Sequence, residues 1–284
     1  MKRLFPLILL LLVPLAAGSY ISISVTLSTE VTENYTRVHV SLEQLGDEAA
    51  YEIEVVPFSS EYFAFGGEVK KDKLYPQEKL RGVFEVYPKK ELKEGSYPFV
   101  AKIVYHDANR YPFSIIAFNP INYGKVSASE VVGSIKNLDV EEGGFGGTVL
   151  KIKNSGERRR EVRVKLYLPN ELKGNVEKEK IVLAPGEEKN LNIEITTRGA
   201  LKGSSYSIGA TLEYEDERHH TFFATGLVRV VERKEGKGLL WWLEVIFIVL
   251  LSIFIYLKVS AGERSEGLGG NSHTKRGEES SDSS

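Results

Sequence analysis

The stretches "LKEGSYPFVAKIVYHDANRYPF" (residues 92–113) and "LKGSSYSIGATLEYEDERHHTF" (residues 201–222) are two versions of one pattern. Their matching residues lie 109 positions apart, and no gap is needed to align them. The same spacing relates "LYPQEKLRGVFEV" (74–86) to "LAPGEEKNLNIEI" (183–195). A period of this length is too long for a solenoid repeat and equals the size of one β-sandwich domain. The sequence therefore indicates a duplicated domain.

Short segments of alternating apolar and polar residues surround the repeat. Examples are "YISISVTLS" (20–28), "TRVHVSL" (36–42) and "LNIEITT" (191–197). Alternation with a period of two is typical of half-buried strands, and Gly, Pro and Asn turns separate the segments. We therefore expect an all-β protein with two tandem immunoglobulin-like β-sandwiches, at residues 19–122 and 123–234.

The boundary between the two sandwiches is expected near "NPINYGK" (119–125), where Asn-Pro and Tyr-Gly steps interrupt the alternation. Each sandwich must bury an apolar layer between its two sheets. For the second sandwich, the alternation predicts a core made of Leu150, Ile152, Val162, Val164, Leu166, Leu191, Ile193, Tyr206, Ile208, Ala210, Leu212 and Tyr214.

Two apolar runs set the predicted topology. Residues 1–18 combine two basic residues, an apolar stretch and a small-residue end, which is the layout of a secretory signal peptide; an uncleaved signal anchor is the alternative. As a helix, the apolar run 239–257 would be roughly 28 Å long, about one hydrocarbon core. We expect a single transmembrane helix there, followed by a disordered cytoplasmic tail at 258–284. The chain is then a single-pass type I protein of the cell membrane, with most of its residues extracytoplasmic.

The apolar run 239–257 contains one charged residue, Glu244, under two turns from its outer end. A carboxylate inside a membrane is often functional, and Glu244 is therefore a candidate intramembrane site. Its shallow position also fits a residue that is protonated or reaches the interface. The flanking aromatic residues Trp241, Trp242 and Tyr256 are of the type that accumulates at membrane interfaces.

Composition excludes several classes of function. The 284-residue chain has a formal net charge of −2 and no basic surplus, so we expect no nucleic-acid partner. It contains no Cys, which excludes disulfides, thiolate metal sites and cysteine-based catalysis. No catalytic or phosphate-binding motif is complete, and we expect neither an enzyme, nor catalytic residues, nor a cofactor.

The stretch "EYEDERHHTFF" (213–223) resembles a metal cluster because it combines acidic residues with two adjacent histidines. In the alignment of the repeat, Asp216 lies in a hairpin turn, and His219 and His220 begin the returning strand. Neighbouring residues of a strand point to opposite faces, so the two histidines cannot easily bind one ion. We therefore interpret the stretch as a polar turn and expect no metal site.

A loop rich in aromatic residues, "PFSSEYFAFGG" (57–67), is specific to the first copy. Phe58, Tyr62, Phe63 and Phe65 are candidates for a patch that stacks on a sugar or contacts a protein. The alternative is that they fold back over the end of the sandwich as part of its core.

Asn34 begins the sequon "NYT" on a segment that we expect to be exported. It is therefore a candidate for glycosylation, which would mark a solvent-facing surface.

The second copy carries three turn and strand motifs: "NSG" (154–156), "LAPGE" (183–187) and "SSYSIGA" (204–210). Over most of residues 147–231 this pattern resembles the NEW-type β-sandwich domain often associated with alpha-galactosidases, and more loosely the CARDB-like adhesion domains. The third motif departs from the family with Ser in place of Gly. The resemblance implies accessory, non-catalytic modules of archaeal or bacterial membrane-anchored surface proteins, and no catalytic position carries over.

These observations together favour a membrane-anchored, extracytoplasmic binding or scaffold protein. We expect the first sandwich to recognise a protein or a glycan at the cell surface, with one helix in the lipid bilayer. The alternative is an accessory subunit of a membrane complex, acting through the second sandwich and the transmembrane helix. Fold analogy by itself does not decide between them.

Overall fold

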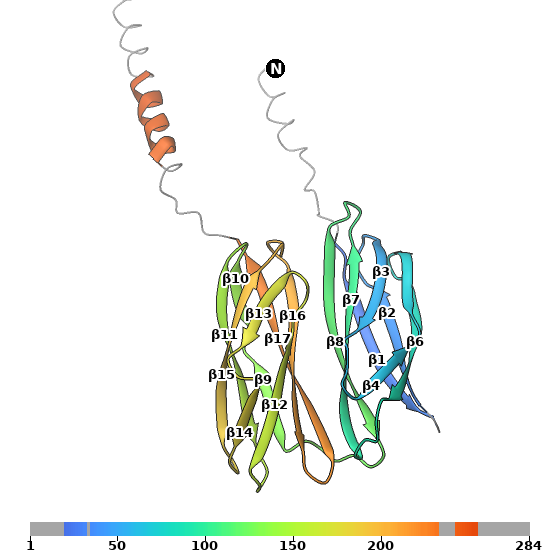
Figure 1. Cartoon of the computed structure of the whole chain (residues 1–284). Helices are drawn as coiled ribbons and strands as arrows, with labels where there is room; N and C mark the ends of the chain where they lie inside the picture. The colour runs from blue at the N-terminus through green and yellow to red at the C-terminus, as the bar shows by residue number, and fades with distance from the viewer. Residues whose placement is uncertain (1–19, 33–34, 233–241, 255–284) are drawn as a thin grey trace, which may run out of the picture. The chain divides into compact units, whose positions relative to one another are not determined.

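The computed structural model describes residues 20–32, 35–232 and 242–254, which form β-strands joined by turns and loops, together with one short helix (Figure 1). The predicted signal peptide (1–18), Asn34 and the predicted tail (258–284) lie outside the described residues. The strands of the first sandwich are β1 (Ile23–Val31), β2 (Thr36–Gln44), β3 (Ala50–Pro57), β4 (Phe63–Gly66), β5 (Val69–Leu74), β6 (Lys79–Pro88), β7 (Gly95–His106) and β8 (Pro112–Tyr123). Those of the second are β9 (Val131–Ile135), β10 (Leu138–Glu141), β11 (Phe145–Asn154), β12 (Arg160–Tyr167), β13 (Leu172–Val176), β14 (Lys180–Leu183), β15 (Glu188–Thr197), β16 (Ser205–Glu215) and β17 (His219–Val231).

The two sandwiches have the same strand order. In the first, the sheet β1-β2-β6-β4 covers strands in the order β8-β7-β3-β5, and in the second, β9-β11-β15-β13 covers β17-β16-β12-β14. The second sandwich adds β10, which pairs in parallel with β17. A single parallel bridge between His219 and Gly95 joins β17 to β7, so one sheet of each sandwich continues into the other. The identical order is what a duplicated domain requires.

Each sandwich encloses its own apolar core, because alternate side chains of every strand point between the two sheets. The core predicted for the second sandwich is confirmed: eleven of the twelve residues are buried, and Leu166 is partly buried against them. The first core is richer in aromatic rings and includes Phe63, Phe84, Tyr97 and Phe99.

A buried amide braces equivalent turns in the two copies. The Gln44 side chain accepts a hydrogen bond from the Gly46 backbone N–H (3.0 Å) and donates to the Glu48 carbonyl. In the second copy, Asn154 accepts from Gly156 N–H (3.0 Å) and donates to the Arg158 carbonyl (2.7 Å). Both amides have no exposed surface. The turn therefore depends on an amide side chain in each copy, not only on the glycine.

The strand at the expected domain boundary is longer than the sequence pattern suggested. β8 continues through the Asn-Pro step and ends at Tyr123, before Gly124, whose φ of 63° suits a residue without a Cβ. The two prolines of β8, Pro112 and Pro120, lie in the outermost strand of the first sandwich's own sheet, where a missing N–H is tolerated. The division into domains at 122/123 stays a prediction.

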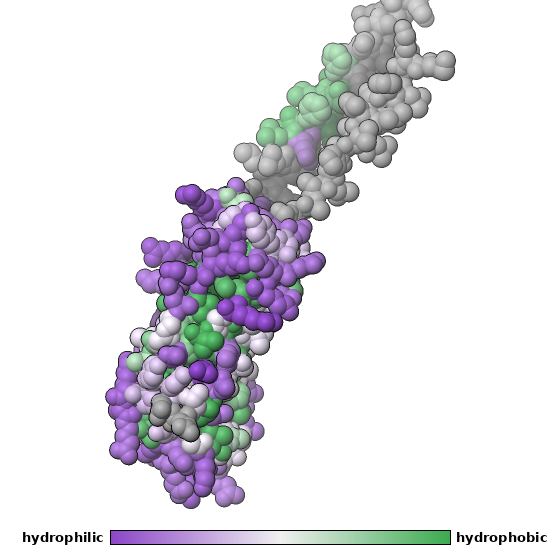
Figure 2. All heavy atoms as spheres, turned by 90° about the vertical axis from the view of Figure 1, so that its right-hand side faces the viewer, coloured by the Kyte–Doolittle hydropathy of each residue, from purple (hydrophilic) through white to green (hydrophobic). Residues whose placement is uncertain are grey.

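The chain divides into a compact unit up to Arg233 and a second unit from Lys234 onward. In the second unit, residues 242–254 form a helix, and its side chains, including that of Glu244, are largely exposed. Figure 2 shows these described side chains as mainly hydrophobic. Over the residues that the structure describes, no helix has both the length and the apolar character needed to cross a membrane.

Candidate functional site

The two sandwiches meet where the β7–β8 hairpin of the first faces the β16–β17 hairpin of the second. The backbone N–H of His219 donates to the Glu94 carbonyl (2.9 Å), and the Thr221 hydroxyl donates to the Ser96 carbonyl (2.8 Å). Gly95 lies directly beneath His219 with φ of 146°, and a Cβ there would collide with the His219 backbone. Glycine at position 95 therefore permits this close approach of two backbones.

A buried polar cluster of Tyr62, Glu213, His219 and Thr211 occupies this boundary. The Tyr62 hydroxyl donates to Glu213 Oε2 (3.1 Å) and lies 3.2 Å from His219 Nε2. His219 Nδ1 donates to the Ser96 carbonyl (2.8 Å), and Thr211 donates to the other Glu213 oxygen (3.1 Å). All four side chains belong to residues less than one tenth exposed. The cluster thus connects a loop of the first sandwich to the hairpin of the second.

Aromatic rings enclose the cluster. The His219 imidazole stacks on Tyr97, with ring centres 4.0 Å apart and planes at 9°. Tyr62 approaches both rings edge-on, with centres 5.1 Å from His219 and 4.8 Å from Tyr97. Burial, and next the Glu213 carboxylate, raise the pKa of Tyr62 far above its ordinary value; burial raises the pKa of Tyr97 to about 12. Both phenols therefore stay neutral and act as hydrogen-bonding groups rather than nucleophiles.

In a second polar contact, a loop of the second sandwich reaches a strand of the first. Ser114 of β8 donates to Glu171 Oε2 (2.6 Å) and accepts from the Asn170 backbone N–H (2.7 Å). Burial raises the pKa of Glu171, which is 5% exposed. Glu171 directly precedes β13, as Tyr62 directly precedes β4, the equivalent strand. The same loop of each copy therefore reaches across to the other copy.

Apolar contacts lie between these two polar contacts. Tyr167 of β12 packs edge-on against Phe58 (centres 5.1 Å apart) and Phe118 (5.9 Å). The Phe118 ring lies against Gly209 of β16, where a Cβ would collide with it. Val100 and Ile116 complete this small buried cluster. The contact between the sandwiches thus has an apolar centre with polar groups on either side.

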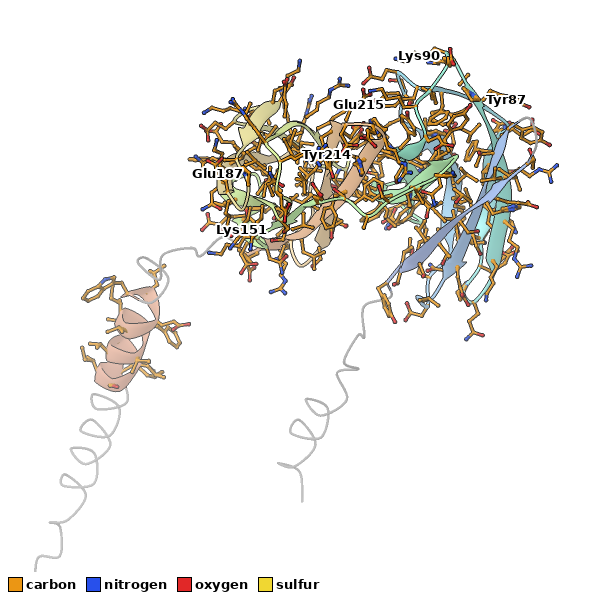
Figure 3. All side chains as sticks on the ribbon, turned by 90° about the horizontal axis from the view of Figure 1, so that it is seen from below. Tyr87, Lys90, Lys151, Glu187, Tyr214 and Glu215 are labelled. Atoms are coloured by element: carbon orange, nitrogen blue, oxygen red, sulfur yellow. The ribbon has the colours of Figure 1, made fainter. Side chains whose placement is uncertain are left out.

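Charged residues line the outer edge of the boundary. A pocket of about 280 Å³ there is lined by both acidic and basic groups, among them Glu213, Arg163 and Lys180. Arg163 pairs with Glu61, and Lys93 lies 3.3 Å from Glu215, so ion pairs also link the sandwiches. Figure 3 labels Glu215 at this boundary. Because both acidic and basic side chains lie around this pocket and form ion pairs there, the pocket is better suited to ion pairs between the sandwiches than to a ligand with a single sign of charge.

The structure places the four candidate aromatic residues mainly inside the fold. Tyr62 (7% exposed) and Phe63 (2%) are buried in the first core, and Phe65 is partly buried against it, with its ring 5.5 Å from Phe99. Phe58 packs on Tyr167 of the second sandwich. This burial favours the second of the two interpretations, in which the loop is part of the core, and adds a contact with the second sandwich.

The histidine pair points in two directions, as the alternation of the strand predicts. His219 faces the first sandwich, whereas His220 stacks on Tyr214 (centres 4.5 Å apart) and lies 3.0 Å from Asp216 Oδ1. Burial opposes ionisation of Asp216, but hydrogen bonds from Arg218 N–H and His220, together with Arg160, lower its pKa to about 2. No group of three or more His, Cys, Asp or Glu residues in the described ranges is placed to hold a metal ion.

Four residues of these contacts belong to no recognisable functional motif in the sequence: Glu213, Thr211, Ser114 and Glu171. A signal for the boundary was present in β16, where Ser207, Gly209 and Thr211 share the face opposite the core. A glycine inside a strand often marks close approach of another backbone or side chain. Both faces of β16 are buried because its own core covers one face and the first sandwich, with Phe118 against Gly209, covers the other.

Comparison with known proteins assigns the chain to no family. No family model matches the chain, and no curated protein matches it. Among solved structures, it is similar to the ASH / PapD-like domain 7 of human CEP192 (13% identity, 40% of this chain and 95% of that chain, TM-score 0.30). It is also similar to the periplasmic chaperone SfaE (9% identity, 74% and 100%, TM-score 0.31) and to a Porphyromonas gingivalis W83 protein of unknown function (12%, 72% and 98%, 0.28). The CEP192 domain and SfaE are immunoglobulin-like or PapD-like β-sandwiches at low identity, and nothing in the comparisons supports the NEW-type or CARDB-like assignment.

Proposed function

We propose that the protein is a membrane-anchored, extracytoplasmic scaffold without catalytic activity, whose two sandwiches act as one rigid unit. The buried polar cluster of Tyr62, Glu213 and His219 is the observation that supports this proposal. Separating the sandwiches would expose its aromatic rings and leave the Glu213 carboxylate without its Tyr62 partner. Burial of these rings and of the apolar contacts around Tyr167 favours the closed arrangement, and the hydrogen bonds pair the Glu213 carboxylate where it is buried. The anchor is the apolar run 239–257, and the signal peptide at 1–18 directs export.

A rigid pair of sandwiches is suited to holding a recognition surface in a fixed orientation. The outer face of the sheet β1-β2-β6-β4 is the best candidate surface of the first sandwich. A shallow pocket of about 340 Å³ there is lined by residues that include Thr26, His39, Arg81 and Val83. Figure 2, which views the molecule from the side of the first sandwich, shows hydrophobic residues between hydrophilic ends. We place recognition of a surface protein or glycan on this face, since the aromatic loop is occupied internally.

The resemblance to NEW-type and CARDB-like domains fits the same role. Domains of that kind are accessory modules on archaeal and bacterial cell surfaces, and the resemblance rests on turn and core residues. It therefore supports a non-catalytic scaffold and says nothing about the ligand.

An accessory subunit of a membrane complex is the second candidate function. Its support is the helix at 242–254, whose exposed apolar side chains surround the single carboxylate of Glu244. A carboxylate in such a helix is a typical point of contact between membrane helices. Under this alternative, assembly depends on the helix and the second sandwich.

Affinity capture of the intact protein from its native membrane, after crosslinking, tests the proposal. Three variants are compared: Arg81→Glu with Val83→Arg on the proposed face, Lys151→Glu on the outer face of the second sandwich as the control, and replacement of 239–257 by an unrelated apolar helix. We expect the first variant alone to lose the captured partner. Loss only on replacement of the helix would instead establish the accessory subunit and contradict the scaffold proposal.

A further inference from the structure

The end of the second sandwich from which the chain continues toward residues 239–257 carries an unusually exposed aromatic residue. Phe145 is 86% exposed, more than any other large hydrophobic residue that the structure describes. It is the first residue of β11 and directly follows the turn, residues 142–144, that connects β10 to β11. The Glu142 backbone N–H in this turn donates to the carbonyl of Val231, the last residue of β17. Phe145 therefore projects beside the point where the sandwich ends.

The turn that carries Phe145 is fixed by hydrogen bonds. The Gly144 N–H donates to the Glu141 carbonyl (2.9 Å), and both the backbone N–H (3.0 Å) and the hydroxyl (3.1 Å) of Thr197 donate to the Gly144 carbonyl. Gly143 adopts a φ of 67°, with open space around the position of a Cβ. The sequence thus places a large apolar ring on a defined, glycine-flanked turn, outside any core.

Described residues near both ends of the compact unit lie close to Lys202 of the second sandwich. Tyr20, the first described residue, is 58% exposed and lines one pocket together with Lys202. Lys202 pairs in turn with Glu232 (3.1 Å), the last described residue before the helix. Tyr20 and Glu232 are the described residues of this unit nearest in sequence to the two predicted apolar segments, 1–18 and 239–257.

We infer that this end, with Phe145 at its tip, is a lipid-contacting surface that rests on the bilayer. The inference rests on the proposed membrane anchor. Seven residues, 232–238, precede the apolar run and span at most about 25 Å when extended, so the tether keeps this end near the bilayer. Aromatic side chains are favoured at the interface between headgroups and acyl chains. Glu141 and Glu142 flank the ring, and their charge fits a neutral rather than an anionic lipid surface.

The absence of cysteine from the chain allows a site-specific test in the full-length protein. Glu142→Cys and the matched control Glu157→Cys place one environment-sensitive fluorophore at opposite ends of β11, roughly 30 Å apart along the strand. Each labelled protein is reconstituted into phosphatidylcholine vesicles that contain a lipid with a spin label near its headgroup. We expect a blue-shifted emission and quenching at position 142, and neither at position 157. Adding Phe145→Ser is expected to reduce the quenching at position 142.

Two outcomes would overturn the inference: equal quenching at the two positions, or quenching at position 142 that is unaffected by Phe145→Ser. A blue shift at position 142 without quenching would indicate contact with protein and would overturn it as well. Flotation of the vesicles separates this result from the anchor itself. If the protein does not float with the vesicles, the proposed membrane anchor fails; if it floats and position 142 is unquenched, only the lipid-contacting surface fails.

Discussion

Tyr62→Phe removes one hydroxyl from the boundary between the sandwiches and leaves the ring in place. This hydroxyl donates a hydrogen bond to Glu213 Oε2 (3.1 Å) and lies 3.2 Å from His219 Nε2. A hydrogen bond to a charged group contributes about 1.5–3 kcal/mol, and more when the acceptor stays buried without its partner. Glu213 keeps Thr211 on its other oxygen, and His219 lies only 3.5 Å away, so we expect no larger loss. The predicted decrease in the free energy of unfolding is about 1.5–3 kcal/mol.

Urea unfolding of the intact protein, followed by circular dichroism, measures this decrease. The matched control is Tyr87→Phe, which removes a hydroxyl that donates to Glu85 (2.6 Å) on the exposed surface, where Tyr87 is 40% exposed (Figure 3). An exposed contact of this kind contributes only about 0–1 kcal/mol. If the two variants unfold at the same urea concentration, the buried cluster does not stabilise the boundary, and the reasoning is refuted.

Three further substitutions test other parts of the structure. Gly209→Ala adds a Cβ that collides with the Phe118 ring; we expect a loss of about 1–3 kcal/mol in thermal or urea unfolding, and unchanged stability would contradict the packing. Burial opposes ionisation of Asp216, but hydrogen bonds from Arg218 N–H and His220, together with Arg160, lower its pKa to about 2. These contacts therefore stabilise the fold above the unfolded pKa of 3.8, and the stabilisation is lost as the pH falls through 2. Asp216→Asn should therefore cost about 1–2 kcal/mol at pH 7, with the difference from wild type closing between pH 3.8 and 2; a difference that does not vary with pH would disprove this origin. Asn154→Ala removes a fully buried amide that braces its turn, and we expect it to lower the free energy of unfolding by about 2–3 kcal/mol. Unchanged stability would show that the glycine alone forms the turn.

Much of the fold follows from periodicity in the sequence. Alternation over two residues predicts both the strands and the face that each strand buries, so the core residues from Leu150 to Tyr214 were predictable. The repeat spacing predicts that the two copies share one topology. The amide of Asn154 lies in a recognisable turn motif, but the hydrogen bonds that it donates depend on where the Arg158, Leu183 and Ala184 carbonyls lie in space.

The boundary between the sandwiches was not predictable in the same way. An outward-facing Glu213 or Thr211 in β16 has the same alternation as a solvent-exposed residue, and only the three-dimensional structure shows what covers that face. Likewise, an aromatic loop has the same composition whether it binds a ligand or packs on a neighbouring sandwich. Tyr62 illustrates this ambiguity, because its partner Glu213 lies 151 positions later in the chain.

We propose that the two sandwiches move as one body. Double electron–electron resonance on the intact protein tests it directly, with spin labels at Lys70→Cys on β5 and Lys178→Cys in the second sandwich, both on exposed side chains. The control pair, Lys70→Cys with Thr26→Cys, lies within the first sandwich. We predict one distance distribution across the boundary that is as narrow as that of the control pair. A distribution that is clearly broader than the control, or that has two maxima, would contradict the account.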